Sequence, residues 1–235
     1  MKPAISCCAL LAARLGNITV FPGSTEYNSS VSSYYSSQAA AVRPACIVLA
    51  QNAEHVSIAL GRLASAPYAP GHDNQTNCLF AIRSGGHAVA PSASNIEGGV
   101  TLDLRGLADV QIDETRTSVS VGVGNTWDAV YAKLQVANLS ANGGRVAGVG
   151  VGGLTLGAGI SYFGTRYGWT ADAVSNYQVV LANGTIVNAS RHRNPDLYWA
   201  LKGGGNNFGV VTRIDLDTFD QGAFWGGLLT HPNNP

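Results

Sequence analysis

Apolar positions in the first third of the chain follow a strand pattern, then a helical one, then a strand pattern again. ACIVLA (45–50) is a short continuous apolar run, AEHVSIALGRLASA (53–66) has apolar residues at helical spacing, and LFAIR (79–83) is a second strand-like run. Residues 69–77 are polar and predict a loop. A strand, a helix and a strand in this order predict parallel strands joined by a right-handed crossover.

The pattern changes in the second half of the chain. Residues 99–138 read as two strand-like stretches and an amphipathic helix, and residues 177–190 read as a hairpin around an Asn-Gly dipeptide, which favours a type I′ turn. A last helix and a last strand are predicted at 194–205 and 208–219. One βαβ unit followed by antiparallel pairs predicts an α+β fold with a mixed or antiparallel second part.

The N-terminal region is harder to interpret from its pattern. MKPAISCCALLAARLG has a lysine and a short apolar stretch, which fits either a weak signal peptide or an amphipathic first helix of the mature protein. STEYNSSVSSYYSSQAAA (24–41) is rich in serine and small residues. We expect it to be an extended lead-in with little core of its own.

Composition narrows the class of protein. The chain has 235 residues, 46% of them hydrophobic, so it can bury a sizeable core. Its 14 acidic and 14 basic residues balance, which argues against nucleic acid as a partner. The sequence has no run of 18 apolar residues, so no membrane span is predicted. The 29 glycines are aperiodic and indicate many close backbone approaches.

Asparagine sequons and cysteines predict an oxidising, secreted setting. Cys7, Cys8, Cys46 and Cys78 form no C-x-x-C pair and no zinc spacing, so we expect no metal site. One or two disulfides are expected, with Cys78 paired to Cys7 or Cys8, and buried free thiols are the alternative. The N-x-S/T sequons occur at Asn17, Asn28, Asn74, Asn138, Asn183 and Asn188.

The loop RSGGH directly follows the second predicted strand, where ligands of such units bind. Successive N–H groups around Gly85 and Gly86 can converge on phosphate oxygens because no Cβ intervenes. The Ser84 hydroxyl would add a donor, and His87 would stand beside the phosphate-bearing group. Without further context, His87 would instead be interpreted as a solvated or capping residue.

Two alternative chemistries are disfavoured by the same stretch of sequence. Gly122 and Gly124 form a G-x-G between a strand and a helix, but Trp127 stands in place of the third glycine of a dinucleotide fingerprint. A strand-to-helix turn is the better interpretation. A serine hydrolase would need a G-x-S-x-G elbow around Ser84, and the sequence there is R-S-G-G-H.

Seven motifs in order resemble one known family: RSGGH, GGVTLDLRGL, VGVGNTWDAVY, GGRVAGVGVGG, RYGWTADAV, VVLANG and NPDLYWALKGGGNNFGVVT. Together they resemble the FAD-binding domain of the vanillyl-alcohol-oxidase (PCMH-type) superfamily, and most of all its berberine-bridge-enzyme-like, often fungal, oxidoreductases. The resemblance implies a two-lobed FAD domain over residues 42–218. Residues 1–41 would then be the lead-in, and 219–235 the truncated start of a substrate domain.

The resemblance also implies the cofactor and its ligands. His87 would be the covalent anchor of the flavin 8α-methyl group, and Ser84, Gly85 and Gly86 would hold the pyrophosphate. The glycine-rich run, with Gly148, Gly150, Gly152 and Gly153, would lie flat along the cofactor. Val211 would line the adenine end of the cofactor. The implied FAD-binding residues are Arg83, Ser84, Gly85, Gly86, His87, Gly148, Val149, Gly150, Gly152, Gly153, Asp172 and Val211.

Three positions either depart from the family pattern or distinguish between groups of its members. Val146 stands where bicovalent relatives carry a second, cysteinyl anchor, so a single covalent link is expected. Val149 falls at the position that gates oxygen, and its small side chain resembles the oxygen-permissive type. Ala173 replaces a common asparagine, which removes one polar contact and leaves Asp172 as either a cofactor contact or a cap.

The activity implied is that of a secreted FAD-dependent oxidoreductase, an oxidase passing hydride from a small organic molecule to FAD and then to O₂. Relatives continue into a substrate domain that supplies the catalytic base, whereas this sequence ends at WGGLLTHPNNP. The alternatives are therefore a flavin-binding fragment without turnover, or one half of a two-chain enzyme with a partner chain. Trp127, Trp169 and Trp199 are expected to be core aromatics, with stacking on the cofactor as the alternative.

Overall fold

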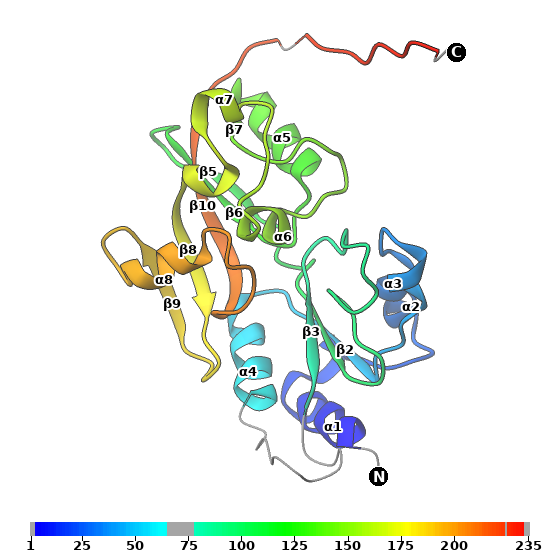
Figure 1. The fold of residues 1–235 in the computed structure, drawn as a ribbon. Helices are drawn as coiled ribbons and strands as arrows, with labels where there is room; N and C mark the ends of the chain where they lie inside the picture. Colours follow the sequence, from blue (N-terminus) through cyan, green and yellow to red (C-terminus); the bar gives the residue numbers. More distant parts are fainter. Residues whose placement is uncertain (1–2, 65–77, 224, 233–235) are drawn as a thin grey trace.

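The computed structural model describes residues 3–64, 78–223 and 225–232. Two β-sheets form two lobes, with α4 (Ala53–Leu63) packed against strands of the second sheet (Figure 1). The predicted loop 69–77, with the sequon at Asn74, lies outside the described residues. Within the described chain, none of the helices has the length and apolar character needed to cross a membrane.

The first sheet contains the predicted βαβ unit. Its strand order is β1-β2-β4-β3, with β1 Thr19–Val20, β2 Cys46–Leu49, β3 Phe80–Arg83 and β4 Val100–Asp103. Both β2 and β3 run parallel to β4, which lies between them. The helix α4 connects β2 to β3 and begins at Asn52, whose side chain accepts a hydrogen bond from the His55 N–H. The parallel arrangement predicted from the periodicity is confirmed.

The N-terminal residues are helical, which corrects the expectation of an extended lead-in. A first helix, α1, spans Pro3–Leu15, and two short helices follow, α2 at Thr25–Ser32 and α3 at Ser37–Ala41. Ser24 and Ser36 cap the two short helices with their hydroxyls. Two of the serines that suggested an extended segment are therefore N-caps, because a serine side chain can accept from backbone N–H groups at a helix start.

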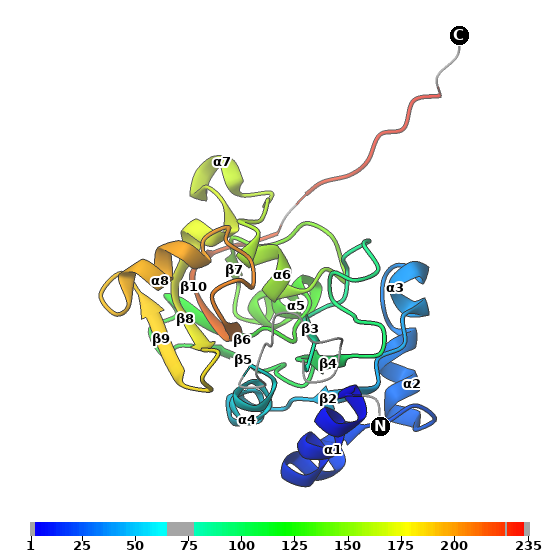
Figure 2. The same cartoon turned by 60° about the horizontal axis from the view of Figure 1, so that its bottom comes forward.

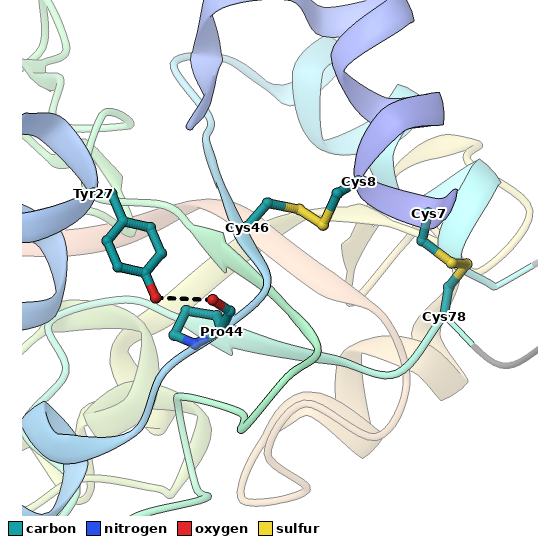
Figure 3. The surroundings of a disulfide bond; sticks show 6 residues. All are labelled: Cys7, Cys8, Tyr27, Pro44, Cys46 and Cys78. Atoms are coloured by element: carbon teal, nitrogen blue, oxygen red, sulfur yellow. Dashed lines mark hydrogen bonds between the residues drawn. A yellow bond between two sulfur atoms is a disulfide. The ribbon is translucent and has the colours of Figure 1, made fainter. Parts of the chain in front are cut away.

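Two disulfides fasten α1 to the first sheet (Figure 3). Cys7 pairs with Cys78, just before β3, and Cys8 pairs with Cys46, the first residue of β2. The prediction that Cys78 pairs with one of the two adjacent cysteines is confirmed. No cysteine in the described residues is free.

The second sheet is antiparallel throughout. Its order is β5-β6-β10-β8-β9, with β5 Val110–Ile112, β6 Ser118–Gly122, β10 Val210–Asp220, β8 Val174–Val180 and β9 Ile186–Ser190. The long strand β10 is central and also pairs at its end with β7 (Leu139–Ala141). Two helices complete this lobe, α5 at Trp127–Val136 and α8 at Pro195–Leu201.

The turn of the β8–β9 hairpin differs from the prediction. The hairpin is where it was expected, but Leu181 accepts a hydrogen bond from the Gly184 N–H, and Gly184 alone of the Asn183-Gly184 pair has positive φ. A type I′ turn needs positive φ at both central residues. The loop is therefore longer than two residues, and the asparagine instead accepts from the Thr185 N–H.

The glycine-rich segment, residues 143–159, holds a short helix α6 at Val151–Leu156, and a short helix α7 at Gly164–Tyr167 and a 3₁₀ turn at Thr170–Ala173 follow it. The sequence pattern revealed none of these three elements. Figure 2 shows the two lobes from a second direction. The larger cluster of buried apolar residues has members in both lobes, and a smaller one lies under α2. Trp127 is fully buried in the larger cluster, as expected, but Trp169 and Trp199 are 55% and 73% exposed, so the prediction of core positions was wrong for these two.

Candidate cofactor site

The loop RSGGH leaves the carboxyl end of β3 and meets the glycine-rich segment backbone to backbone. A Cβ added at Gly85 would stand 2.5 Å from the Gly150 Cα, and one added at Gly150 would stand 2.4 Å from the Gly85 nitrogen. Real Cβ atoms do not approach that closely, so both positions require glycine. This contact joins the two lobes at the mouth of the candidate site.

Ser84 fastens the same junction with its side chain. Its hydroxyl donates to the Val123 carbonyl at 2.6 Å and accepts from the Gly152 N–H at 3.2 Å. One side chain thus bridges β3, the start of the loop after β6, and α6. The hydroxyl hydrogen is donated to a protein carbonyl. A role of Ser84 as a hydrogen-bond donor to phosphate therefore stays a prediction.

A cavity of about 570 Å³ opens beside this junction. Its size is within the range of small-molecule and cofactor sites. Among the described residues that line this cavity, His87 is the one with an ionisable side chain. Nine of the twelve predicted FAD-binding residues line it: Ser84, Gly85, Gly86, His87, Val149, Gly150, Gly152, Gly153 and Val211.

The remaining three predicted residues lie outside that lining. Arg83 is fully buried and points to the α2–α3 side, where its guanidinium donates to the Ser33 carbonyl at 2.9 Å. Gly148 has positive φ and donates its N–H to the Asp128 carboxylate at 2.8 Å. Asp172 accepts from the Trp169 N–H at 2.9 Å, which is the capping role weighed for it from the sequence.

A cluster of charges lies directly behind the loop. The Asp103 carboxylate is 3.9 Å from the Arg83 guanidinium and 2.7 Å from that of Arg105. Two positive groups and one negative group leave a formal charge of +1 beneath Gly86. Burial lowers the pKa of Arg83, and the Asp103 carboxylate opposes that shift. A positive field behind a loop of peptide N–H groups favours an anionic ligand in front of it.

His87 is held by an aromatic partner from the N-terminal helices. The Tyr35 ring stacks on the imidazole with centroids 3.8 Å apart and an interplanar angle of 14°. The Tyr35 N–H also donates to the Gly86 carbonyl at 3.1 Å. The His87 side chain is thus partly exposed and packs against one aromatic ring.

Several lining residues were missed in the sequence. Most are apolar or small residues of loops, strand ends and α6, which carry no chemical signal of their own. Gly205 and Asn206 could have been found, because they belong to the GGGNN run within the last resembling motif. The missed residues are Ile82, Ala88, Ala93, Ser94, Leu104, Val123, Leu154, Leu156, Gly157, Gly159, Gly205 and Asn206.

A second cavity, of about 730 Å³, lies beside the glycine-rich segment between α5 and β7. Val146 lines it and is 58% exposed, whereas Val149, three residues on, lines the first cavity. The two valines that the sequence singled out therefore face different spaces.

The site is suited to a long, flat, anionic cofactor. Bare backbone at Gly85 and Gly150, a cavity wall of glycines, and a positive cluster behind the loop fit a nucleotide coenzyme bearing phosphates. The fold and this candidate site are those of a cofactor-binding domain in which residues of a βαβ sheet and of an antiparallel lobe line one cavity.

Comparison with known proteins identifies the family. Residues 44–190 match the FAD binding domain family, and the chain belongs to it. The chain is 46% identical over 215 residues to the FAD-dependent monooxygenase tpcD of Cochliobolus heterostrophus, covering 92% of this chain and 40% of that protein. It is 47% identical to the FAD-dependent monooxygenase FUP4 of Fusarium proliferatum, covering 86% of this chain and 37% of that protein.

Solved structures with the same fold include two oxidases. The 6-hydroxy-D-nicotine oxidase of Arthrobacter nicotinovorans has a TM-score of 0.76 at 26% identity, covering 88% of this chain and 43% of its own. The xylooligosaccharide oxidase of Myceliophthora thermophila has a TM-score of 0.76 at 27% identity, covering 90% and 43%. The resemblance to the vanillyl-alcohol-oxidase superfamily is thereby confirmed. The chain spans about two fifths of the length of the curated relatives it matches.

Proposed function

We propose that this chain holds FAD for an oxidoreductase that removes a hydride from a small organic molecule. The observation that carries the proposal is the backbone contact of Gly85 with Gly150 beside a cavity that His87 also lines. FAD, when bound, supplies the hydride-accepting ring, and the protein supplies position and electrostatics. The glycine wall admits the cofactor closely, and the Arg83–Asp103–Arg105 cluster favours its phosphates.

We propose further that His87 anchors FAD through a single covalent bond. His87 lines the cavity and its ring is already oriented by Tyr35, both of which support this role. A second, cysteinyl link is not expected, because Val146 occupies that place and both disulfides consume the cysteines among the described residues.

The electron acceptor that we propose is O₂. Val149 supports it, since a small apolar side chain at the cavity wall leaves room for a diatomic molecule. The relatives named above include both monooxygenases and oxidases, and dioxygen is a reactant for each of these classes. Room for dioxygen at Val149 favours an oxygen-using enzyme over a dehydrogenase, and within that class we propose an oxidase.

One observation favours a second possibility, that the described residues bind FAD without turnover. The described cavity lining holds no aspartate, glutamate, lysine or tyrosine that could act as a general base, and His87 is committed to the anchor. Trp225, Leu228 and Leu229 are about nine-tenths exposed, which fits a segment that packs on further protein. Catalysis would then need a base from a substrate domain or a partner chain.

A secreted setting is also proposed. Two disulfides within the described residues fit an oxidising compartment. The sequon asparagines Asn17, Asn28, Asn138 and Asn183 are exposed, as glycosylation requires. Peptide-N-glycosidase treatment of the natively secreted protein should lower its mass, and a chain found unglycosylated in the medium would contradict glycosylation.

The covalent link is tested by colour after acid precipitation. The purified chain should carry FAD absorbance, and this should stay with the acid pellet. His87→Ala should release the flavin into the supernatant, whereas His192→Ala, at an exposed histidine outside the cavity, should behave like the parent. A parent chain that takes up no FAD from an excess of it would overturn the proposed function.

Turnover is tested separately on the flavin-loaded chain. The loaded chain is incubated without oxygen with candidate alcohols, sugars or aldehydes. A loss of flavin absorbance, followed by release of peroxide when air is admitted, would support an oxidase. Bound flavin that no candidate reduces would support the fragment or the two-chain alternative.

A further inference from the structure

The turn between α2 and α3 clamps the outer side of the RSGGH loop. The Arg83 guanidinium donates to the carbonyl and the hydroxyl oxygen of Ser33, and its carbon atom lies 3.8 Å from the centre of the Tyr34 ring. The Tyr34 hydroxyl donates to the Ser94 carbonyl at 2.8 Å, farther along the same loop. These are buried or half-buried contacts, so the turn and the loop form one packed unit.

The next two residues of the turn continue the clamp. The Tyr35 N–H donates to the Gly86 carbonyl at 3.1 Å, and the Ser36 hydroxyl donates to the Val89 carbonyl at 3.2 Å. Both neighbours of the Tyr35 side chain are thus tied to the segment that carries His87. These bonds hold the Tyr35 backbone beside the loop, and its ring, 65% exposed, lies against the His87 imidazole.

The ring stack restricts how the imidazole can turn. A free histidine side chain rotates about two bonds, and the second of these has a broad energy profile. With the Tyr35 ring parallel to it at 3.8 Å, the His87 ring is held in one plane. The same imidazole lines the cavity, so its position relative to any bound cofactor is set by a residue from outside the cavity.

We propose that Tyr35 is a positioning residue for the covalent attachment of FAD to His87: the stacked ring holds the imidazole in the orientation that the attachment reaction needs. The proposal rests on the proposed function, since it deepens the role given there to His87. Tyr35 does not line the cavity, so it acts through His87.

The attachment reaction that Tyr35 assists conserves atoms and electrons. A bond forms between an imidazole nitrogen of His87 and the 8α carbon of the flavin, while one C–H bond of the methyl group and the imidazole N–H bond break. The two hydrogens leave as protons and the two electrons remain in the flavin, which takes up two protons and ends reduced. Dioxygen then reoxidises it and is converted to hydrogen peroxide. A near-attack orientation of the imidazole speeds the bond-forming step.

The test follows the rate of covalent attachment. The chain is produced in riboflavin-starved cells, mixed with FAD, and sampled over time for acid-stable flavin. Tyr35→Leu, which removes the ring, should slow attachment roughly 3- to 10-fold, the effect of losing one aromatic pair. Tyr35→Phe should restore the parent rate because it keeps the stack. Trp199→Leu, at an exposed aromatic residue outside this turn, should leave the rate unchanged.

Two further measurements separate positioning from a structural role. The reversible affinity for FAD, measured in the His87→Ala background, should be the same with Tyr35 or leucine at position 35. The NMR signal of the His87 ring in the flavin-free chain should show a ring-current shift in the parent and in Tyr35→Phe, and lose it in Tyr35→Leu. Tyr35→Gln serves as a second variant without the ring.

The outcomes are distinct. A parent rate in Tyr35→Leu would overturn the proposal, and so would a slower rate that Tyr35→Phe fails to restore. Weaker reversible FAD binding in Tyr35→Leu would assign Tyr35 a structural role instead. If the parent binds FAD but forms no acid-stable adduct, the covalent part of the proposed function fails and this inference fails with it.

Discussion

Arg83 and Asp103 are register partners on the neighbouring parallel strands β3 and β4, and both are buried. Their charged groups are 3.9 Å apart, and each also hydrogen-bonds to the N-terminal segment: Asp103 accepts from the Ser30 hydroxyl and Arg83 donates to the Ser33 carbonyl. Ser30 donates to the Asp103 carboxylate at 2.7 Å and also accepts from Arg83. The pair therefore couples the sheet, the helix α2 and the RSGGH loop in one network.

Removing the charge of Asp103 should be strongly destabilising. Asp103→Asn leaves Arg83 in the interior without its counter-charge and removes the bidentate partner of Arg105. Breaking a buried ion pair from one side costs about 3–5 kcal/mol. Chemical denaturation should show that loss, while Asp217→Asn, an exposed aspartate of β10, should change the free energy of unfolding by less than about 0.5 kcal/mol. Equal effects of the two changes would refute the coupling.

The glycine contact gives a prediction for cofactor affinity. Gly85→Ala places a methyl group 2.5 Å from the Gly150 Cα, so the two loops must separate. The affinity for FAD should fall roughly tenfold or more, about 1.4 kcal/mol, and the melting temperature should fall with it. Gly164→Ala makes the same chemical change in α7, where nothing lies within 4 Å of the new carbon, and should be neutral or slightly stabilising. Titration with FAD and thermal melting measure both effects.

Buried Tyr34 predicts a loss of stability at alkaline pH. Burial raises the pKa of Tyr34 to about 12, above the ordinary value of 10.0 that the unfolded chain has. Below pH 10 both states hold the proton, but between pH 10 and 12 the unfolded state releases it and the folded state does not. The free energy of unfolding therefore falls as pH rises through that window.

The matched variant for this effect is Tyr34→Phe. Between pH 9 and pH 11 the parent should lose about 1 kcal/mol more stability than the variant, measured by denaturant midpoints at each pH. Burial also raises the pKa of Tyr131 and of Tyr177, so both proteins keep some alkaline sensitivity. An identical pH dependence in parent and variant would show that Tyr34 titrates normally in the folded chain.

The disulfide between Cys7 and Cys78 should contribute measurably to stability. It closes a loop with a sequence separation of 71, for which the chain-entropy model gives about 4 kcal/mol. Cys78→Ser should lower the free energy of unfolding by about 3–4 kcal/mol and make one thiol reactive toward Ellman's reagent after denaturation. Three reactive thiols in that variant would indicate that the Cys8–Cys46 bond had not formed.

The order of the elements was readable in the chain because periodicity is a local property. The apolar runs at 45–50 and 79–83 and the helical spacing at 53–66 predicted β2, β3 and α4 and their parallel arrangement. The RSGGH loop was identified by its glycines for the same reason, since a glycine pair beside a strand end signals close backbone approach. The resemblance of the ordered motifs then predicted FAD as the cofactor, and it predicted nine of the residues that line the cavity.

The local sequence pattern gave wrong predictions where one composition is compatible with two different structures. The serine-rich residues 24–41 were predicted to be extended, yet they form α2 and α3, and two of the serines, Ser24 and Ser36, cap these helices. The Asn-Gly pair predicted a two-residue turn, but the backbone places only Gly184 at positive φ. Burial of Trp169 and Trp199 was likewise expected from hydrophobicity alone, which does not specify the side of an element that faces the core.

The sequence by itself determined the strands, the crossover helix, the glycine loop and the histidine at its end, because each depends on neighbours within one or two turns of chain. Only the tertiary structure set Tyr35 against His87, Gly85 against Gly150, and Arg83 opposite Asp103. These pairs join segments far apart in the chain, and their contact depends on how two sheets and the N-terminal helices pack together. That packing is settled by the summed burial of many side chains, which the pattern of any single stretch does not contain.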